Sequence, residues 1–309
     1  MSGTNIERVI VTGSGGWVGS ATIELAQQME SAPEIVALAQ HPRVLRVGEQ
    51  DLDALSMDAL QSLPAKPATC LIHCGFPTQD RVESMGASSY MNAVMDLRQT
   101  MVTAIRKLCP DVCVYLSSGA ATSVERGVDV AERTQVYGQA KLDDEAAYAE
   151  AMARTGGRLC IVRAFALSGP YMTKPEAYAL GSMIMQAEAT GRIEVRATRP
   201  VRRSYMAIDD MLRIAIHAVG ELESGDSVTF ETAGEIVEMG ELALRVLGVL
   251  GADPSAVRRP EFKPDAPPND YLGDTREMER LANVAGVVLS DLDRQIAVTA
   301  DWLCVEGIA

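Results

Sequence analysis

A tyrosine and a lysine four residues apart, Tyr137 and Lys141, lie within residues 134–154, whose composition predicts a long helix. Side chains four residues apart lie on the same face of a helix. A lysine ammonium near a phenol favours the phenolate and lowers the phenol's pKa from about 10 towards neutrality. A group that exchanges a proton with a hydroxyl or a ketone needs this property. Such a pair is common on helix surfaces, so its meaning depends on the residues around it.

Two serines precede this pair at the end of an apolar run. Ser117 and Ser118 follow residues 112–116, which predict a buried strand, and they stand before Gly119. Ligands of open α/β sheets bind at the carboxyl ends of the strands, where a hydroxyl can hold a reacting oxygen. The alternative is a pair of turn serines, but the Tyr–Lys pair favours a catalytic interpretation.

A glycine-rich turn follows the first predicted strand, residues 8–11, and opens a helix. Gly13, Gly16 and Gly19 let the backbone turn tightly, and we expect them, with the intervening Trp17 and Val18, to contact the cofactor. A pyrophosphate binds well at such a helix N-terminus. Three glycines can also simply form a turn, but their position between first strand and first helix predicts nucleotide binding.

The end of the second predicted strand, residues 34–39, discriminates between cofactors. A carboxylate there usually holds the adenosine ribose hydroxyls. Here the strand is followed by Gln40-His41-Pro42-Arg43. Arg43 could meet a 2′-phosphate, which inclines the prediction for an NAD(P) cofactor towards NADP. Alternatively, Arg43 is a solvated loop residue.

The element order predicts an α/β protein with a Rossmann-type, doubly wound parallel sheet. Apolar strands at 8–11, 34–39, 68–74, 112–116 and 159–162 alternate with helices at 20–30, 85–108 and 134–154. This alternation is typical of a parallel sheet with helices on both faces. We expect an NAD(P)-binding domain over 1–165. Residues 166–309 would form mainly a smaller C-terminal α/β substrate domain, with some segments returning to the first.

Composition excludes several classes of function. The net charge of −14 disfavours binding to nucleic acid or to an anionic membrane surface. No signal peptide or apolar run long enough to span a membrane is present, and the six cysteines lie mostly in apolar runs, so we expect a reducing cytoplasm. Cys70 and Cys74 share one face of a strand while His73 points away, so we expect no metal site.

These motifs together resemble the extended short-chain dehydrogenase/reductase family, the nucleotide-sugar epimerases, dehydratases and reductases. The resemblance covers most of the chain. It rests on the glycine turn, Asp51-Leu52, Leu71-Ile72-His73, Asn92, Ser117-Ser118-Gly119-Ala120, Tyr137-x-x-x-Lys141, Arg163, Gly169-Pro170, Arg203-Ser204-Tyr205 and Asp209-Asp210.

The resemblance assigns roles by position. Asp51 and Leu52 would contact adenine, and Asn92 would help to organise the catalytic set. Ser118 fits the catalytic serine better than Ser117, and Arg203 would bind the diphosphate of a nucleotide sugar. Further cofactor contacts are expected at Cys74 and Gly75, and a substrate contact at Phe76.

Departures from the family pattern bear on the reaction. Sugar 4,6-dehydratases carry Asp-Glu after the serine or threonine position, whereas this chain has Gly119-Ala120. Ala166 stands where many relatives have an asparagine, and Ser168 replaces a frequent tyrosine. Elimination of water is therefore not expected, and a standard UDP-galactose-type epimerase is a poorer match.

The function expected from the sequence is an NAD(P)-dependent nucleotide-sugar epimerase or ketoreductase. One alternative is an NADPH-dependent reductase of a non-sugar carbonyl compound. Another is a non-catalytic NAD(P)-sensing regulator, against which the intact Tyr137–Lys141 pair counts. A homodimer through the helices at 85–108 and 134–154 is also expected.

Overall fold

A computed structural model describes residues 6–259 and 261–307, and the chain divides into two compact units. The first contains residues up to Ala164 together with Leu212–Phe230, and the second contains Phe165–Met211 and residues from Glu231 onward. The first change of unit falls one residue before the predicted boundary. The segment that returns to the first unit is Leu212–Phe230.

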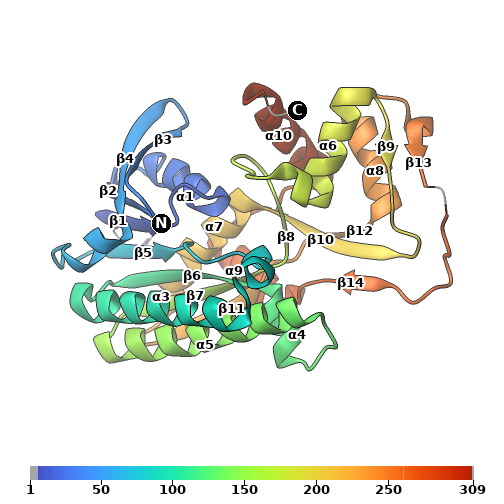
Figure 1. Ribbon diagram of the computed structural model, residues 1–309. Coiled ribbons are helices and arrows are strands. Elements are labelled where there is room, and N and C mark those ends of the chain that lie inside the picture. Colours follow the sequence, from blue (N-terminus) through green and yellow to red (C-terminus); the bar gives the residue numbers. More distant parts are fainter. Residues whose placement is uncertain (1–5, 260, 308–309) are drawn as a thin grey trace. The chain divides into compact units, whose positions relative to one another are not determined.

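The first unit is built on an eight-stranded sheet, which confirms the predicted Rossmann-type fold (Figure 1). The strand order is β11-β7-β6-β5-β1-β2-β4-β3. Pairing is parallel from β7 to β4, through β6, β5, β1 and β2. The strands are β1 (Arg8–Thr12), β2 (Glu34–Ala39), β3 (Arg43–Val47), β4 (Gln50–Ser56), β5 (Thr69–His73), β6 (Val112–Ser118), β7 (Arg158–Ala164) and β11 (Ser227–Glu231).

Helices cover both faces of this sheet (Figure 1). Long helices α3 (Ala87–Leu108) and α5 (Glu132–Thr155) lie on one face, and α1 (Trp17–Gln27) lies on the other. The apolar stripe of α3 packs with the sheet and α5 around a fully buried core that includes Met101, Ile105 and Leu71. The remaining helices of this part of the chain are α2 (Asp80–Met85), α4 (Gly119–Glu125) and α7 (Ile208–Ala218), which spans the change of unit.

The helix predicted over 85–108 is interrupted at Gly86. This residue has a φ of 79°, in the left-handed region that favours glycine, and it separates α2 from α3. Further along, α5 ends at Thr155, and Gly156, with a φ of 75°, is its C-cap.

A hairpin that the sequence did not indicate forms one edge of the sheet. β3 pairs antiparallel with β4, and β4 pairs parallel with β2. Only Leu45, Val47 and Ala54 are buried along these two strands. The apolar runs that predict central strands are therefore missing here.

The second unit contains a smaller sheet in the order β12-β10-β14, with β8 also paired to β10. Its core is formed largely by helices α6, α8 and α10 and includes Ile184, Leu242 and Ile296. The elements are β8 (Ala166–Ser168), α6 (Ala179–Thr190), β9 (Ile193–Glu194), β10 (Val201–Ala207), β12 (Glu235–Glu238), α8 (Met239–Val249), β13 (Val257–Arg258), β14 (Asn269–Tyr271), α9 (Thr275–Ala285) and α10 (Leu292–Val305).

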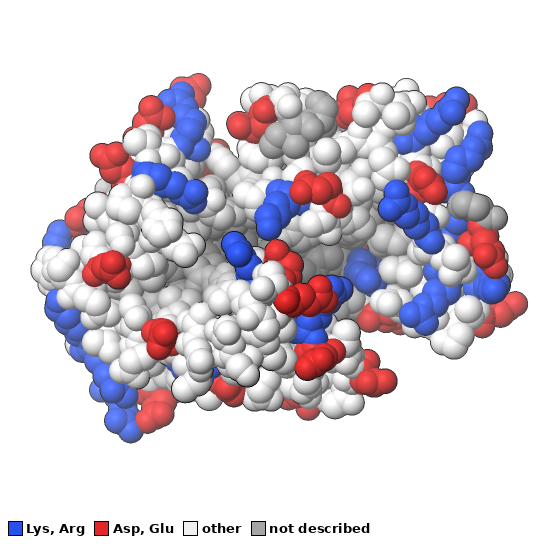
Figure 2. All heavy atoms as spheres, viewed as in Figure 1, with Lys and Arg blue, Asp and Glu red and all other residues white. Residues whose placement is uncertain are grey.

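The surface carries both signs of charge. Figure 2 shows acidic and basic side chains intermingled over the face in view. Within the described ranges 6–259 and 261–307, none of the helices combines the length and apolar character that crossing a membrane requires.

Candidate active site

The glycine turn between β1 and α1 forms a close-packed cradle. Gly13 has a φ of 66°, and a β-carbon there would lie 2.5 Å from the backbone nitrogen of Gly75. Helix α1 begins directly after Gly16, which is its N-cap, and its first turn has no acidic residue. An uncapped helix N-terminus without nearby negative charge suits a pyrophosphate, so this cradle fits a dinucleotide.

Arg43 lies against the same turn. A β-carbon on Gly15 would fall 1.5 Å from Nη2 of Arg43, so the guanidinium occupies the space that this glycine leaves open. The Arg43 side chain is exposed, and none of the described carboxylates pairs with it. A cation without a carboxylate partner among the described residues therefore lies next to the cradle. It follows β2 in the sequence, and the residues between them include no carboxylate.

The structure does not bring Asp51 and Leu52 to this edge of the sheet. β2 and β4 pair Leu38 with Leu55 near their carboxyl ends, so Asp51 lies about 13 Å further back along its strand. The neighbouring Gln50 contacts Gln27, the last residue of α1, at the opposite edge. Asp51 itself pairs with Arg46 across the hairpin. The structure therefore places Asp51 away from the carboxyl end of β4, which is Ser56.

The loop after β5 lies beside the glycine turn, as expected for Cys74 and Gly75. The Cys74 amide donates to the Thr12 carbonyl at 3.3 Å, and the Gly75 amide donates to Thr12 Oγ1 at 3.3 Å. Burial raises the pKa of the Cys74 thiol to about 12, so this group stays protonated at neutral pH. These residues are placed to form the wall of a cofactor site by backbone and shape.

The two serines at the end of β6 point to different places. Ser117 is buried, and its hydroxyl hydrogen-bonds to Glu145 of α5. Ser118 caps α4, because its Oγ accepts a hydrogen bond from the Ala120 amide at 3.2 Å. Successive residues of a strand face opposite sides. Ser118, at the carboxyl edge and half-buried, is the serine that a ligand can reach.

Tyr137 and Lys141 lie on one face of α5, as predicted, and Phe76 contacts both. The Lys141 ammonium lies 5.8 Å from the centre of the Tyr137 ring and 3.7 Å from that of Phe76. It donates a hydrogen bond to the Leu116 carbonyl of β6 at 2.8 Å. Burial lowers the pKa of Lys141 to about 7, with nearby Asp144 opposing that shift.

A glycine beside Tyr137 lets the two catalytic helices approach closely. A β-carbon on Gly138 would lie 2.4 Å from the Ala120 carbonyl oxygen and 2.6 Å from Val124 Cγ2. Ala120 is two residues from Ser118, and Gly138 is next to Tyr137. The backbone contact between α4 and α5 therefore brings the serine end of β6 to the tyrosine.

Asn92 does not join this group. Tyr90 and Val94 of α3 are buried in the apolar cluster that contains Phe76 and Tyr137. Asn92 is exposed, because two residues along a helix turn a side chain about 200° around the axis. The structure therefore does not bring Asn92 into this apolar cluster, in which Val94 is buried.

A buried polar network behind the site was not anticipated. His73 Nδ1 and Thr12 Oγ1 are 2.6 Å apart, and Tyr148 donates to Asp144 at 3.1 Å. Tyr115 also donates to Asp144, at 3.2 Å. Burial, together with Lys141, lowers the pKa of His73 to about 3. The sequence signal for this network is a histidine, His73, at the end of an otherwise apolar strand.

A second buried network surrounds Arg163 of β7. Its guanidinium binds Glu145 at 2.7 Å and Glu125 at 2.5 Å, and the same Glu145 accepts the hydrogen bond of Ser117. Burial acts to lower the pKa of Arg163, but the hydrogen bonds that its guanidinium donates to both carboxylates outweigh this and raise the pKa. This network ties α4, α5, β6 and β7 together beneath Ser118.

The second unit holds Arg203, the expected diphosphate ligand. Its Nη1 donates to the backbone carbonyls of Arg202 and Asn269 at 2.8 and 3.1 Å, and the guanidinium carbon lies 5.8 Å from the Tyr271 ring centre. Ser168 is buried and bonded to Gln295 at 2.7 Å, so its hydroxyl links β8 to α10.

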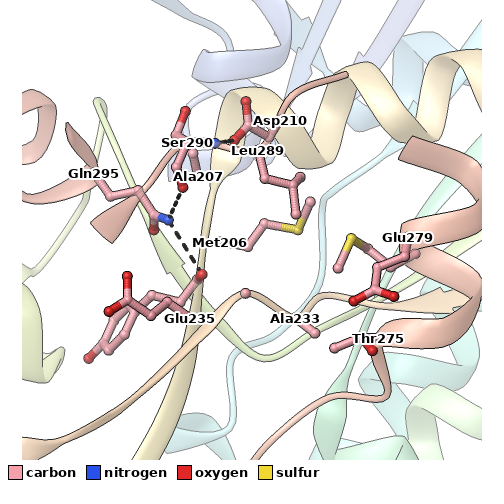
Figure 3. A pocket seen from close by; sticks show the side chains of 13 residues that line it. Met206, Ala207, Asp210, Ala233, Glu235, Thr275, Glu279, Leu289, Ser290 and Gln295 are labelled. Carbon is pink, nitrogen blue, oxygen red and sulfur yellow. Dashed lines mark hydrogen bonds between the residues drawn. The ribbon is translucent and has the colours of Figure 1, made fainter. Parts of the chain in front are cut away.

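A cavity of about 180 Å³ also lies in the second unit (Figure 3). Asp210 in its wall accepts from the Ser290 amide at 2.7 Å, and the Gln295 amide donates to the Ser290 carbonyl at 2.8 Å. None of the sequence-predicted site residues lines this cavity, so it is not the site assembled above. Across the described ranges, no group of three or more His, Cys, Asp or Glu is placed to hold a metal ion.

Comparisons with known proteins agree with this arrangement. A family model described as NAD dependent epimerase/dehydratase family matches residues 9–240. A search of curated protein sequences finds no match.

Several solved structures share the fold. A dTDP-glucose 4,6-dehydratase from Streptomyces venezuelae, solved with NAD bound, is 18% identical, with a TM-score of 0.71 over 96% of this chain and 97% of that one. A UDP-glucose 4-epimerase from Thermotoga maritima, solved with UDP-glucose, is 16% identical, with a TM-score of 0.71 over 97% and 99%. A UDP-N-acetylglucosamine 4-epimerase from Methanobrevibacter ruminantium is 14% identical, with a TM-score of 0.75 over the same shares.

The family match extends over the glycine turn, Ser118, the Tyr137–Lys141 pair and Arg203, that is, over every motif on which the resemblance rested. The chain therefore belongs to the NAD dependent epimerase/dehydratase family and is an enzyme of the extended short-chain dehydrogenase/reductase type.

Proposed function

We propose that this enzyme exchanges hydride and proton at one carbinol or ketone carbon of a nucleotide sugar, as an epimerase or a ketoreductase. The observation that supports the proposal is that Lys141 lies beside Tyr137 on α5 and donates to the Leu116 carbonyl, two residues before Ser118, in the same unit as the glycine cradle. Solved structures with this fold were obtained with UDP-glucose or with NAD, which supports the substrate and cofactor classes.

Each residue of the set has a distinct role. The Tyr137 phenol gives or takes the proton of the reacting oxygen, and the Lys141 ammonium favours its phenolate form by Coulomb attraction. The Ser118 hydroxyl hydrogen-bonds the same oxygen and orients it. A nicotinamide dinucleotide held by the glycine cradle would supply hydride exchange at the adjoining carbon. Arg203 would bind the diphosphate of the substrate.

The residues after Ser118 argue against elimination. Gly119 and Ala120 are buried at the start of α4 and carry no acid or base. Two carboxylates of the neighbouring helices, Glu125 of α4 and Glu145 of α5, are both bound to Arg163. Removal of water needs an acid and a base at this position, so redox-linked epimerisation or reduction is the chemistry that these side chains support.

The two adjacent serines provide a matched test. Ser118→Ala and Tyr137→Phe should each lower turnover at least about 100-fold on a nucleotide-sugar panel while leaving dinucleotide binding intact. Ser117→Ala makes the same change at the neighbouring serine, whose hydroxyl faces Glu145. This control should lower thermal stability with little change in turnover. Full turnover by Tyr137→Phe would refute the mechanism. Turnover only on ketones without a nucleotide would redirect the substrate assignment to non-sugar carbonyl compounds.

For the cofactor, we propose a preference for NADP over NAD. The exposed Arg43 guanidinium beside Gly15, without a carboxylate partner among the described residues, supports a contact with a 2′-phosphate. Arg43→Ala should weaken NADP binding about tenfold without affecting NAD binding. Arg46→Ala, on the same strand but paired with Asp51, is the control. Stoichiometric NAD released from the denatured protein, identified by mass spectrometry, would refute the preference.

For the assembly, we propose a homodimer through the outer faces of α3 and α5. Exposed Met95 and half-buried Ala147 border a depression on these helices that also contains Arg98, Arg106 and Glu150. A face that presents both charges and apolar side chains can pair with a second copy of itself. Light scattering should give about twice the chain mass, and Met95→Glu should give monomers.

A further inference from the structure

Phe76 touches both members of the tyrosine–lysine pair. Its ring face lies 3.7 Å from Nζ of Lys141, and its ring meets that of Tyr137 edge-on at 5.7 Å with an angle of 80°. The residue follows β5 in the loop that packs against the glycine turn. The sequence predicted a substrate contact for Phe76, but the structure turns its ring towards the catalytic pair.

The Lys141 ammonium has few other partners. It is almost completely buried, and the Leu116 carbonyl is the one hydrogen-bond acceptor it meets among the described residues. Within these residues no carboxylate lies within the 4.0 Å of an ion pair. An ammonium cut off from water needs compensation, and the electron-rich face of an aromatic ring supplies part of it.

The charged and titratable groups around Lys141 come from three elements and the loop after β5. Asp144 and Glu145 favour its charged form from α5 itself, and the Tyr115 ring lies 4.9 Å away on β6. The full set comprises Asp144, Glu145, Tyr137, Tyr115, His73 and Cys74. Of the three aromatic rings around the ammonium, those of Phe76, Tyr115 and Tyr137, the Phe76 ring is the closest.

We propose that Phe76 is a positioning residue, whose ring face holds the Lys141 ammonium in its charged form and in place beside Tyr137. Its mechanistic consequence rests on the proposed function of the tyrosine–lysine pair. The electrostatic contact itself is a property of the protein without cofactor or substrate. A leucine would fill much of the same volume but would lack the negative face.

The contact can be measured directly, because the chain has only five lysines (Lys66, Lys107, Lys141, Lys174 and Lys263). Titration of the ¹³Cε resonances in cofactor-free protein should give Lys141 a midpoint near 7. Site-specific replacement of Phe76 by mono-, di- and trifluorophenylalanine weakens the ring quadrupole with little change in shape. The Lys141 midpoint should fall stepwise, by about one pH unit across the series.

The same fluorinated series at Phe230, a buried phenylalanine of the first unit that has no cationic contact among the described residues, is the control and should leave the midpoint unchanged. Equal midpoints in all Phe76 variants would overturn the proposal. This readout needs no turnover, so it distinguishes failure of the contact from failure of the proposed function.

A kinetic readout then tests the positioning role. Phe76→Leu should shift the ascending limb of the kcat–pH profile and lower kcat about tenfold, with little change in KM, whereas Phe76→Tyr should restore both. A parallel rise of KM in both variants, with unshifted pH profiles, would instead assign Phe76 to substrate contact and refute the positioning role.

Discussion

Burial of the Lys141 ammonium links the stability of the protein to pH. Its pKa is about 7 in the folded protein, below the ordinary value of 10.5, because burial disfavours the charge. The unfolded chain therefore binds more protons between these two values, and stability rises with pH across that window. Lys141→Met removes the penalty, so we expect its free energy of unfolding to exceed that of the parent by about 2 kcal/mol at pH 7.

This advantage should shrink as the pH approaches 10, where the parent lysine is neutral in the folded state as well. Urea unfolding at pH 7 and pH 10 measures the two differences, and an assay should show that turnover is lost. A Lys141→Met variant less stable than the parent at pH 7 would mean that the partners of the ammonium outweigh the cost of its burial.

Because of His73, the stability of the protein should also depend on pH on the acidic side of neutrality. Its pKa falls to about 3 because of burial and the nearby Lys141, against an ordinary value of 6.5. Stability should be fully present above 6.5 and decline as the pH falls towards 3. Between pH 6.5 and 5, the parent should lose about 2 kcal/mol more than His73→Asn, which cannot titrate there. Parallel unfolding curves for the two proteins would contradict this expectation.

At the scale of elements, the contact between α4 and α5 sets the geometry of the catalytic set. In Gly138→Ala, the new β-carbon would fall 2.4 Å from the Ala120 carbonyl oxygen, which is backbone and cannot rotate away. The helices must separate, so we expect a loss of about 1–3 kcal/mol in stability despite better helix propensity. Turnover should fall more than tenfold, because Ser118 and Tyr137 move apart.

Gln139→Ala is the matched control for this variant, since Gln139 is the next residue of α5 and is exposed. Unfolding midpoints and turnover of both variants check the prediction. If Gly138→Ala kept full activity, the close approach of the two helices would not be what positions the serine and the tyrosine.

Among the strands of the large sheet, sequence patterns predicted those that contain a buried apolar run and missed the exposed strands β3 and β4 at one edge. The strand at 34–39 was predicted with the bounds that β2 has, because its carboxyl half is a buried apolar run. The β3–β4 hairpin has few buried residues and lies at a sheet edge, so no strand was predicted over residues 43–56. Asn92 was assigned a role by the family resemblance, and its side chain is exposed on α3.

In the candidate site, too, some features could be predicted from local sequence patterns and others could not. Tyr137 and Lys141, and the glycine turn, are local patterns: the first two lie on one face of α5, and the turn lies between β1 and α1. The approach of Phe76 to Lys141, and of Arg43 to Gly15, joins residues 65 and 28 positions apart in the chain. Such contacts depend on strand order and side-chain direction, which no local pattern specifies.

For the whole molecule, the path of the chain between the two units has a consequence for the order of folding. The edge of β7 meets its partner β11 only after an excursion through Phe165–Met211. The Leu159 amide, for example, donates to the Asp226 carbonyl at 3.0 Å, across 67 positions of sequence. A nascent chain that has emerged only as far as β7 exposes an unpaired apolar strand, a risk for association with other chains.

Pulsed hydrogen exchange during refolding can follow this step. Amides of β1 and β5, whose neighbours are already present, should be protected first, and the Leu159 amide should gain protection later, together with the second unit. Simultaneous protection would show that the sheet closes in one step. If protection is sequential, the sheet of the first unit is completed only when the second unit has been synthesised in part, so vectorial synthesis couples the folding of the two units.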